Sequence, residues 1–497
     1  MLSILVGHSY FQNFDSKQLA RAKPYPPLAT LQVAARLRQA GHRITFFDAM
    51  LAGSPREFDV LLNSARPDLV LFYEDNYNYL SKMCLGKMRD AAGEMIASAR
   101  GAGARVIAAG SDVSDAPEAY LRMGADLVLR GEGLSGLHRL LARLDDDGHA
   151  DNAGLIEGLS DVSTLVDDRV VTGQPTEPGA KVIAVKGAGA RTSDVLDETA
   201  AWDLVDVPRY RTIWEGAHGY FSLNMAASKG CSFRCAWCAK PIWGDRYQQR
   251  SAVSVAAEMT HLKRTFGVEH IWFADDIFGF RADWVSSFAD ALRETDGAVP
   301  FNIQTRADLV TPAMAKALKA AGCHEAWIGA ESGSQRVLDA MNKGTSVAEI
   351  VAARALLKAE GIRVGFFIQL GYLGEQLDDL LATRELIEAA EPDDIGVSVS
   401  YPLPGTRFHE MVRDQLGAKT HWDDSRDLSM MFHGTYNSQF YREIRDLLHR
   451  QVDLKRLDAA AAITRHREDR EALRRQWNAL IANEMQYRSQ VNLASEA

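Results

Sequence analysis

The feature that most constrains this chain is a regular alternation of short apolar segments with helical segments over its first 145 or so residues. Continuous apolar strands separated by helices build a parallel sheet that is covered on both faces. The sequence therefore predicts five strand–helix units in a doubly wound α/β domain over residues 1–148. The expected strands are 4–6, 44–47, 69–72, 106–108 and 127–129.

This arrangement predicts a flavodoxin-like, Rossmann-type fold, in which ligands bind beyond the carboxyl ends of the strands. The loops after the strands are therefore the places to look for a binding site. In one of these loops, Gly110 and Ser111 offer backbone and hydroxyl groups to a ligand, or simply form a turn that begins a helix. The loops of interest are 7–12, 73–77, 110–114 and 131–133.

A second alternation of strands and helices follows a connector. Residues 149–215 are punctuated by Gly and Pro and predict a connector with a few short strands. Residues 216–410 predict six strand–helix units, which suggest a partial (β/α)6 TIM barrel. Residues 411–497 predict a charged helical region with an apolar stripe between 440 and 452. The expected barrel strands are 221–226, 270–274, 301–304, 326–329, 364–370 and 395–400.

Composition narrows the class of protein. The net charge is −10, from 56 basic and 66 acidic residues, which disfavours a non-specific nucleic-acid-binding protein. No segment has the roughly 20 consecutive apolar residues that a membrane-spanning helix needs. The first residues lack a basic segment before their apolar run, so we expect no signal peptide and a cytoplasmic protein.

Three of the five cysteines lie within eight residues, at Cys231, Cys235 and Cys238. This clustering points to metal binding rather than disulfides. A 4Fe–4S cluster ordinarily uses four thiolates. Three thiolates on one loop would hold three irons and leave the fourth iron open to a chelating small molecule.

Two other interpretations of the cysteines are open. A structural zinc site needs four ligands, usually as two separated pairs, and here only His218 or His261 could supply the fourth. The three cysteines could also be unrelated core residues. The spacing favours the iron–sulfur cluster. Cys84 and Cys323 lie on helical patterns, and we expect both to be core residues.

The spacing C-x3-C-x2-C resembles the signature of the radical S-adenosylmethionine (SAM) superfamily. The resemblance implies that the aromatic residue before the third cysteine, Trp237, packs against the adenosine of SAM. It also implies that the second barrel strand ends in residues that receive the amino group of the methionine. Asp275 and Asp276 stand there, in an acidic version of a motif that is commonly glycine-rich.

The same resemblance assigns residues at the ends of the next three strands. It implies that Arg306 and Glu331 hold the zwitterionic end of the methionine, because opposite charges suit its carboxylate and ammonium. An ion pair between Arg306 and Glu331 that ties adjacent strands together is the alternative. Gln369, at the end of the fifth strand, is assigned to the same cofactor.

A flavodoxin-like domain before such a barrel resembles the cobalamin-binding module of cobalamin-dependent radical SAM enzymes, and the likeness covers residues 1–480. Gly110 and Ser111 are the residues that the resemblance brings toward cobalamin. The module of methionine synthase carries the motif D-x-H-x-x-G, whose histidine binds cobalt. Here Val6 and Phe11 replace its Asp and Gly around His8, so we expect cobalamin without this histidine ligand.

The resemblance implies an enzyme that reductively cleaves SAM to a 5′-deoxyadenosyl radical and methylates an unactivated carbon of a small molecule. It also implies an external electron donor of the flavodoxin or ferredoxin type. Ring formation or oxidation without methyl transfer, as in the anaerobic magnesium-porphyrin cyclase, is an alternative. A non-enzymatic cluster or cobalamin sensor is another, although no DNA-binding helix pair or basic stripe is recognisable.

Overall fold

The structure is a computed structural model of the 497-residue chain. It describes residues 1–78, 85–146, 151–174, 199–238, 242–244, 246–417, 428–457 and 463–489, and the predicted core residue Cys84 lies outside them. The contacts divide the chain into two compact units. The first unit contains the described residues of 1–231 and 240–275, and the second contains those of 232–239, 276–420 and 424–497.

The first unit is built on a seven-stranded sheet with the strand order β2-β1-β3-β4-β5-β6-β7. Its first five strands are parallel, and their order 2-1-3-4-5 is that of flavodoxin. All five predicted strands are therefore confirmed. The strands are β1 (Ser3–Gly7), β2 (Arg43–Phe47), β3 (Leu69–Tyr73), β4 (Arg105–Ala109), β5 (Leu127–Leu129), β6 (Val162–Val166) and β7 (Arg169–Thr172).

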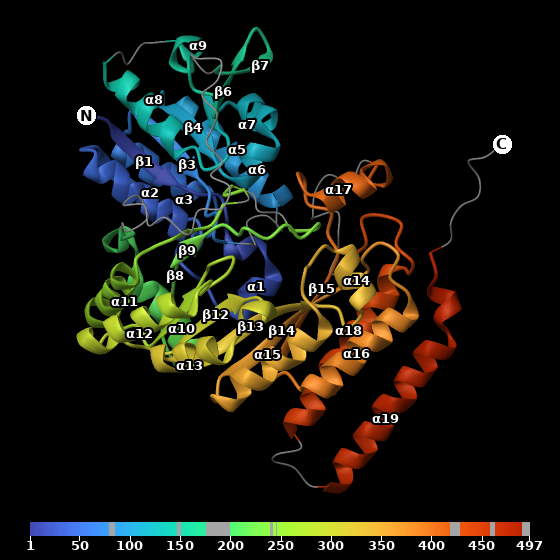
Figure 1. The fold of residues 1–497 in the computed structure, drawn as a ribbon. Coiled ribbons are helices and arrows are strands. Elements are labelled where there is room, and N and C mark those ends of the chain that lie inside the picture. The colour runs from blue at the N-terminus through green and yellow to red at the C-terminus, as the bar shows by residue number, and fades with distance from the viewer. Residues whose placement is uncertain are drawn as a thin grey trace, which may run out of the picture. The chain divides into compact units, whose positions relative to one another are not determined.

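Helices cover both faces of this sheet (Figure 1). Alternate residues of each central strand point to opposite faces, so that Val70 packs with one helical layer and Leu71 with the other. This double burial explains why the central strands are apolar at most positions. One layer contains α2 (Leu28–Gln39) and α8 (Leu134–Asp146), and the other contains α3 (Arg56–Ala65), α5 (Leu85–Gly101) and α7 (Pro117–Met123).

The sheet continues into the segment that the sequence predicts as a connector. Strands β6 and β7 form a hairpin that pairs antiparallel with β5. The first unit also contains a second parallel pair, formed by β8 and β11, and a short antiparallel pair, β9–β10. The elements are α10 (Val207–His218), β8 (Ser222–Met225), β9 (Ser228–Lys229), β10 (Gln248–Gln249), α11 (Ala252–Phe266) and β11 (His270–Phe273).

The second unit contains four parallel strands in the order β15-β14-β13-β12. Together with β8 and β11, all six strands predicted for the barrel are present. The elements are α12 (Ala282–Thr295), β12 (Phe301–Thr305), α13 (Pro312–Ala321), β13 (Cys323–Glu331), α14 (Gln335–Ala340), α15 (Val347–Ala359), β14 (Arg363–Leu370), α16 (Leu377–Ala390), β15 (Asp394–Val399) and α17 (Arg407–Val412).

The C-terminal region is helical, as predicted. Helices α18 (Ser438–Leu457) and α19 (Ile463–Ala482) lie side by side (Figure 1), and α18 also contacts α16 and β15. The apolar residues predicted to form one stripe of α18 are buried. They are Phe440, Ile444, Leu447, Leu448 and Val452.

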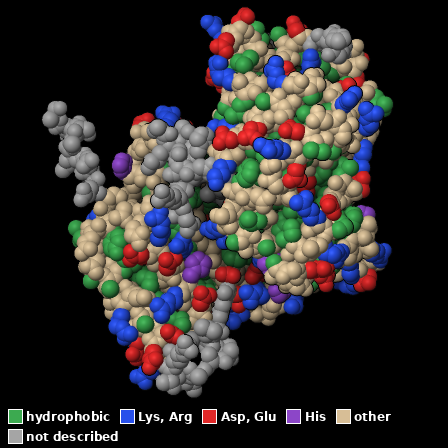
Figure 2. All heavy atoms as spheres, turned by 180° about the vertical axis from the view of Figure 1, so that it is seen from behind, with side chains coloured by type: hydrophobic (Ala, Val, Ile, Leu, Met, Phe, Trp, Pro, Cys, Tyr) green, Lys and Arg blue, Asp and Glu red, His purple; other side chains and the backbone are tan. Residues whose placement is uncertain are grey.

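The surface shows mixed charge. On the face shown in Figure 2, Lys and Arg side chains are scattered among Asp and Glu rather than gathered into one area. Across the part of the chain that the structure describes, no helix combines the length and the apolar character required to span a bilayer.

The fold makes a direct prediction about the core of the first unit. We expect Leu71→Ala to lower the free energy of unfolding by about 2–5 kcal/mol, because Leu71 is fully buried and its truncation leaves a cavity. Urea denaturation followed by circular dichroism measures this loss. Val60→Ala on the exposed face of α3 is the control, and we expect a change of less than about 0.5 kcal/mol. Equal effects of the two substitutions would contradict the assigned packing.

Candidate active site

The three clustered cysteines lie on the loop that follows β9. Cys231 is buried, and Cys235 and Cys238 are half-buried. The boundary between the two units passes just after Cys231. Among the described residues, no three His, Cys, Asp or Glu side chains form a group that could hold a single metal ion. The assignment of the cysteines to a cluster therefore stays a prediction.

Three hydrogen bonds hold the part of this loop that carries the second and third cysteines. The Asn342 side chain donates to the carbonyl of Arg234 at 2.7 Å. The amide of Ala236 donates to the carbonyl of Met341, and its own carbonyl accepts from the amide of Phe408, both at 2.8 Å. The end of α14 and the start of α17 thus fix the loop within the second unit.

Asp275 braces the turn that leads to Cys231. This buried carboxylate accepts hydrogen bonds from the amide of Ala227 at 3.0 Å and from the hydroxyl of Ser228 at 2.5 Å. Both of its oxygens are therefore engaged by the turn before the cysteines. Its neighbour Asp276 is exposed. The predicted role of both residues toward a methionine amino group stays a prediction.

Arg306, which follows β12, lies beside Cys235. Its Nη1 is 3.7 Å from the Sγ of Cys235, and its guanidinium stacks on the ring of Phe233 at 3.6 Å from the ring centre. Asp308 binds the other side of the guanidinium through two hydrogen bonds of 2.9 and 3.0 Å. The carboxylate partner of Arg306 is therefore Asp308, and the alternative of an Arg306–Glu331 pair is wrong.

Glu331 at the end of β13 forms a buried ion pair with Lys343. The Nζ of Lys343 is 2.7 Å from Oε1 of Glu331, and both side chains are about 95% buried. A side chain at Gly329 would lie 2.6 Å from both of these charged atoms, so only glycine leaves room for them. Glu331 itself has a φ of +60°, a conformation that is uncommon for a residue other than glycine within a strand.

The environment of Lys343 favours its charged form. Burial by itself lowers the pKa of a lysine, but the neighbouring carboxylate of Glu331 and the thiolate of Cys235 outweigh this effect and raise its pKa. The ammonium also lies 5.8 Å from the ring centre of Trp237. Glu331, Lys343, Cys235 and Trp237 therefore surround one small region of the second unit.

Trp237 presents an unused hydrogen-bond donor at this region. Its buried indole Nε1 finds no acceptor among the residues that the structure describes. Its ring packs against an apolar cluster that contains Tyr372 and Phe408, which stack at 4.8 Å. Gln369 lies apart from these contacts and donates to the Ser400 hydroxyl at 2.9 Å.

The first unit contains a small cavity at the carboxyl ends of its central strands. Gly110 follows β4 with a φ of +152°, and a side chain there would meet the Cβ of Glu74 at 2.6 Å. The hydroxyl of Ser111 is buried and has no partner among the described residues. Both residues thus lie where the sequence predicts a ligand. The cavity is lined by Ser9, Tyr10, Glu74, Met88, Arg89, Ser111, Asp112 and Tyr120.

Two acidic residues after β3 are buried near this cavity. Burial raises the pKa of Glu74, although the amide of Ser9 donates to both of its oxygens at 3.0 and 3.1 Å. Burial likewise raises the pKa of Asp75 to about 6, against the opposing effect of the Ala29 amide. Neither residue was singled out from the sequence.

His8 is engaged within the first unit. Its Nε2 accepts a hydrogen bond from the amide of Ala49 at 3.1 Å and lies 3.3 Å from Asp48. Tyr210 donates to the other oxygen of Asp48 at 2.7 Å. The ring is fully buried, and these contacts suit the expected role of an ordinary loop histidine.

Sequence reasoning missed the residues that organise the cysteine loop in the second unit. Lys343 holds Glu331, while Asp308 and Thr345 hold Arg306. The sequence offers only a weak indication that residues 341–345 have this role. The segment 341–345 interrupts two helical patterns and contains a lysine next to a glycine, which is ordinary loop composition.

The comparisons with known proteins define the class. Residues 225–387 match the radical SAM superfamily. This range contains the three cysteines and the residues at the ends of β11 to β14. The chain therefore carries a domain of the radical SAM superfamily.

Named relatives add detail. The chain is 25% identical to the hopanoid C-3 methylase of Methylococcus capsulatus over 405 residues, which cover 78% of this chain and 69% of that protein. It is 26% identical to an uncharacterized methyltransferase of Pyrococcus horikoshii, over 42% of this chain and 45% of that protein. It is also 26% identical to the anaerobic magnesium-protoporphyrin IX monomethyl ester cyclase of Cereibacter sphaeroides, over 59% of this chain and 45% of that protein. The matches thus span about half the length of several of these relatives.

Solved structures share the fold. The cobalamin-dependent SAM radical enzyme OxsB, with aqua-cobalamin and SAM bound, gives a TM-score of 0.66 at 16% identity and covers 98% of this chain and 71% of its own. The radical SAM methyltransferase TsrM of Kitasatospora setae, with cobalamin and a [4Fe-4S] cluster bound, gives a TM-score of 0.63 at 18% identity. The match covers 84% of this chain and 76% of the TsrM chain. The chain therefore has the α/β fold of cobalamin-dependent radical SAM enzymes.

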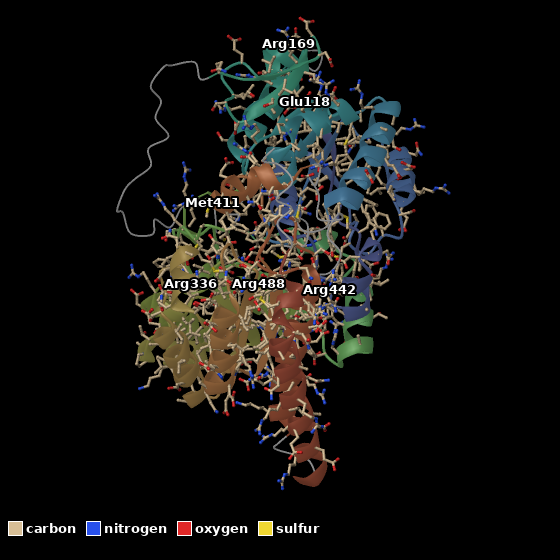
Figure 3. The ribbon with its side chains drawn as sticks, turned by 90° about the vertical axis from the view of Figure 1, so that its right-hand side faces the viewer. Glu118, Arg169, Arg336, Met411, Arg442 and Arg488 are labelled. Carbon is tan, nitrogen blue, oxygen red and sulfur yellow. The ribbon has the colours of Figure 1, made fainter. Side chains whose placement is uncertain are left out.

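A buried acid lies in the loop after β14. One oxygen of Glu375 accepts from the amide of Gly371 at 2.5 Å, and the other finds no partner among the described residues. Burial raises its pKa to about 8, with a smaller contribution from Asp379. Arg336, labelled in Figure 3, opposes the rise and itself donates to Asp379.

We therefore expect stability to depend on pH through Glu375. The unfolded chain ionises this residue near pH 4.5, whereas the native chain does so near pH 8. Its stabilising contribution is thus complete below pH 4.5 and is lost as the pH rises toward 8, by up to about 4 kcal/mol. Glu375→Gln should remove this slope in denaturant unfolding between pH 5 and 8. The exposed Asp378→Asn is the control and should keep it; equal slopes in wild type and Glu375→Gln would contradict the assignment.

Proposed function

We propose that this protein is a cobalamin-dependent radical SAM enzyme that methylates an unactivated carbon of a small molecule. The observation that carries the proposal is the position of the cysteine triad, Cys231, Cys235 and Cys238, at the start of a radical SAM domain in a chain with the fold of OxsB and TsrM. When bound, the cluster, SAM and cobalamin supply the electron, the 5′-deoxyadenosyl radical and the methyl group. An external flavodoxin- or ferredoxin-type donor would supply electrons to the cluster.

The donor set around the cysteines suits an iron–sulfur cluster. Thiolates are the protein ligands of such clusters, and reduction adds negative charge to them. The Arg306 guanidinium lies within hydrogen-bond distance of Sγ of Cys235 and the Lys343 ammonium lies nearby, while Asp308 and Glu331 balance the charges of these two cations. The loop itself is held by two backbone hydrogen bonds, to Met341 and Phe408, and by one from the Asn342 side chain.

The residues near Cys235 also suit the methionine and adenosine parts of SAM. Glu331 and Lys343 offer opposite charges for the ammonium and carboxylate of a zwitterion. Trp237 offers an aromatic face and an unused indole N–H donor. The predicted set also contains Asp275, Asp276, Arg306 and Gln369. The strained backbone of Glu331 directs a charged side chain into this region, which supports a binding role.

The cavity of the first unit suits the polar parts of cobalamin. The buried hydroxyl of Ser111 lacks a partner among the described residues, and Gly110 beside it leaves room for Glu74, which lines the same cavity. A buried unpaired polar group is costly, and a ligand with an acceptor would remove this cost. Nε2 of His8 accepts from the amide of Ala49, although its buried Nδ1 has no partner among the described residues, and this contact supports a cobalamin that does not take Nε2 as its lower ligand.

The cysteine triad gives the first test. We expect the full-length protein, reconstituted without oxygen, to bind iron and sulfide and to release 5′-deoxyadenosine from SAM when reduced. Replacement of all three cysteines with alanine should abolish both, whereas Cys323→Ala, which removes a buried thiol elsewhere, should retain bound iron. Iron content that is unchanged in the triple variant, or zinc alone in the wild type, would contradict the proposal.

The reaction class needs a separate test, because the relatives include both methyltransferases and cyclases. SAM that carries a labelled methyl group should transfer its label to the product if the enzyme methylates carbon. Product formation with no label would favour ring formation or oxidation, the chemistry that the named magnesium-protoporphyrin relative suggests.

Ser111 gives a test of the cobalamin site that is independent of turnover. Because its buried hydroxyl has no partner in the described part of the chain, Ser111→Ala should leave the stability of the cobalamin-free protein unchanged or higher. It should weaken cobalamin binding by about five- to tenfold, the loss of one hydrogen bond. Spectrophotometric titration with cobalamin measures this.

Ser114→Ala is the matched control for this test. The hydroxyl of Ser114 donates to Gly110 and accepts from the amide of Gly131, so its removal should destabilise the loop itself. Unchanged cobalamin affinity in Ser111→Ala would place the cofactor elsewhere.

A further inference from the structure

Arg306 is engaged on almost every side by the protein. Asp308 accepts from Nε and Nη2, and the two hydrogens of Nη2 are shared among Asp308, the carbonyl of Lys343 at 2.8 Å and the hydroxyl of Thr345 at 2.9 Å. Phe233 covers one face of the guanidinium at 3.6 Å. The side chain is only 5% exposed, so water does not compete for these contacts.

The remaining nitrogen of Arg306 points to the thiol sulfur of Cys235. Nη1 lies 3.7 Å from Sγ, within the range of an N–H···S hydrogen bond. Cys235 is a predicted ligand of the cluster. The guanidinium of Arg306 already has a carboxylate partner, Asp308. A bound methionine carboxylate would have to share the guanidinium with these partners.

We infer that Arg306 donates a hydrogen bond to the Cys235 thiolate and thereby raises the reduction potential of the cluster that this thiolate binds. The inference rests on the proposed function and gives Arg306 a role different from the methionine contact expected from the sequence. The contacts of Arg306 with Asp308, Lys343 and Thr345 direct its Nη1 toward Cys235. We therefore assign Arg306 to tuning the cluster rather than to binding SAM.

Electrostatics explains why this hydrogen bond raises the reduction potential of the cluster. Reduction places an extra electron on the cluster and its thiolates, and an N–H donor stabilises the more negative state. In a buried, low-dielectric environment this effect is stronger than in water. The charge of Arg306 is balanced by Asp308, and that of Lys343 by Glu331. The local N–H···S bond, rather than the net charge, is therefore the dominant effect.

The test compares cluster potentials in the full-length protein, reconstituted without oxygen. Arg306→Met removes the donors but keeps an apolar side chain on Phe233. The double variant Arg306→Met/Asp308→Asn also removes the carboxylate, so that no buried charge is left unpaired and the net charge is preserved. Arg474→Gln on the exposed surface of α19 removes one positive charge that solvent screens and serves as the control.

A redox titration followed by electron paramagnetic resonance of the reduced cluster gives the readout. We expect both Arg306 variants to show at least a tenfold lower equilibrium constant for one-electron reduction, a shift of ~59 mV to more negative potential. Arg474→Gln should match the wild type. If Arg306→Met does not fold, the double variant carries the test alone, because its buried charges are balanced.

Other results would overturn the inference. Unchanged potentials in variants with wild-type iron content would remove the role of Arg306 and leave the proposed function intact. A double variant that regains the wild-type potential would assign the effect to net charge instead of the hydrogen bond. A tenfold loss of SAM affinity with an unchanged potential would place Arg306 at the methionine carboxylate. Wild-type protein that binds no iron would overturn the proposed function and the inference together.

Discussion

The arrangement of the second unit depends on one buried ion pair, that between Lys343 and Glu331. Two buried charges are expensive to desolvate, and removal of one partner leaves the other uncompensated at a cost of about 3–5 kcal/mol. The pair therefore fixes the segment 341–345 against the end of β13. From this anchored segment, Met341 and Asn342 hold the cysteine loop, while the Lys343 carbonyl and Thr345 hold Arg306.

The two candidate sites share a physical logic. Both lie at the carboxyl ends of parallel strands, where loops diverge and leave space for ligands. At each site a glycine makes room for a buried charged side chain. Gly110 accommodates Glu74 in the first unit, and Gly329 accommodates the Lys343–Glu331 pair in the second. A substitution at either glycine would disturb the charged residue before it touched any ligand.

Two of the residues predicted to contact the methionine also hold other parts of the protein. Asp275 was expected to contact the methionine, yet both of its oxygens hold the turn that precedes Cys231. Arg306 was expected to contact the same group, yet Asp308 and Cys235 are its partners. Polar residues at strand ends can therefore hold loops of the protein as well as ligands. Sequence position alone does not distinguish these two roles.

The sequence by itself determined the strands, the parallel character of the sheets and the cysteine spacing. These features are local, because burial on both faces requires apolar residues at most positions of a central strand and three thiolates on one loop need no distant partner. Tertiary structure alone decided the partners of the charged residues. Lys343 meets Glu331, 12 residues away, and Arg306 meets Cys235, 71 residues away. The tertiary structure alone also revealed that β6 and β7 extend the first sheet with antiparallel pairing. Contacts of this kind depend on which loops converge in space, and no periodicity in the chain encodes that convergence.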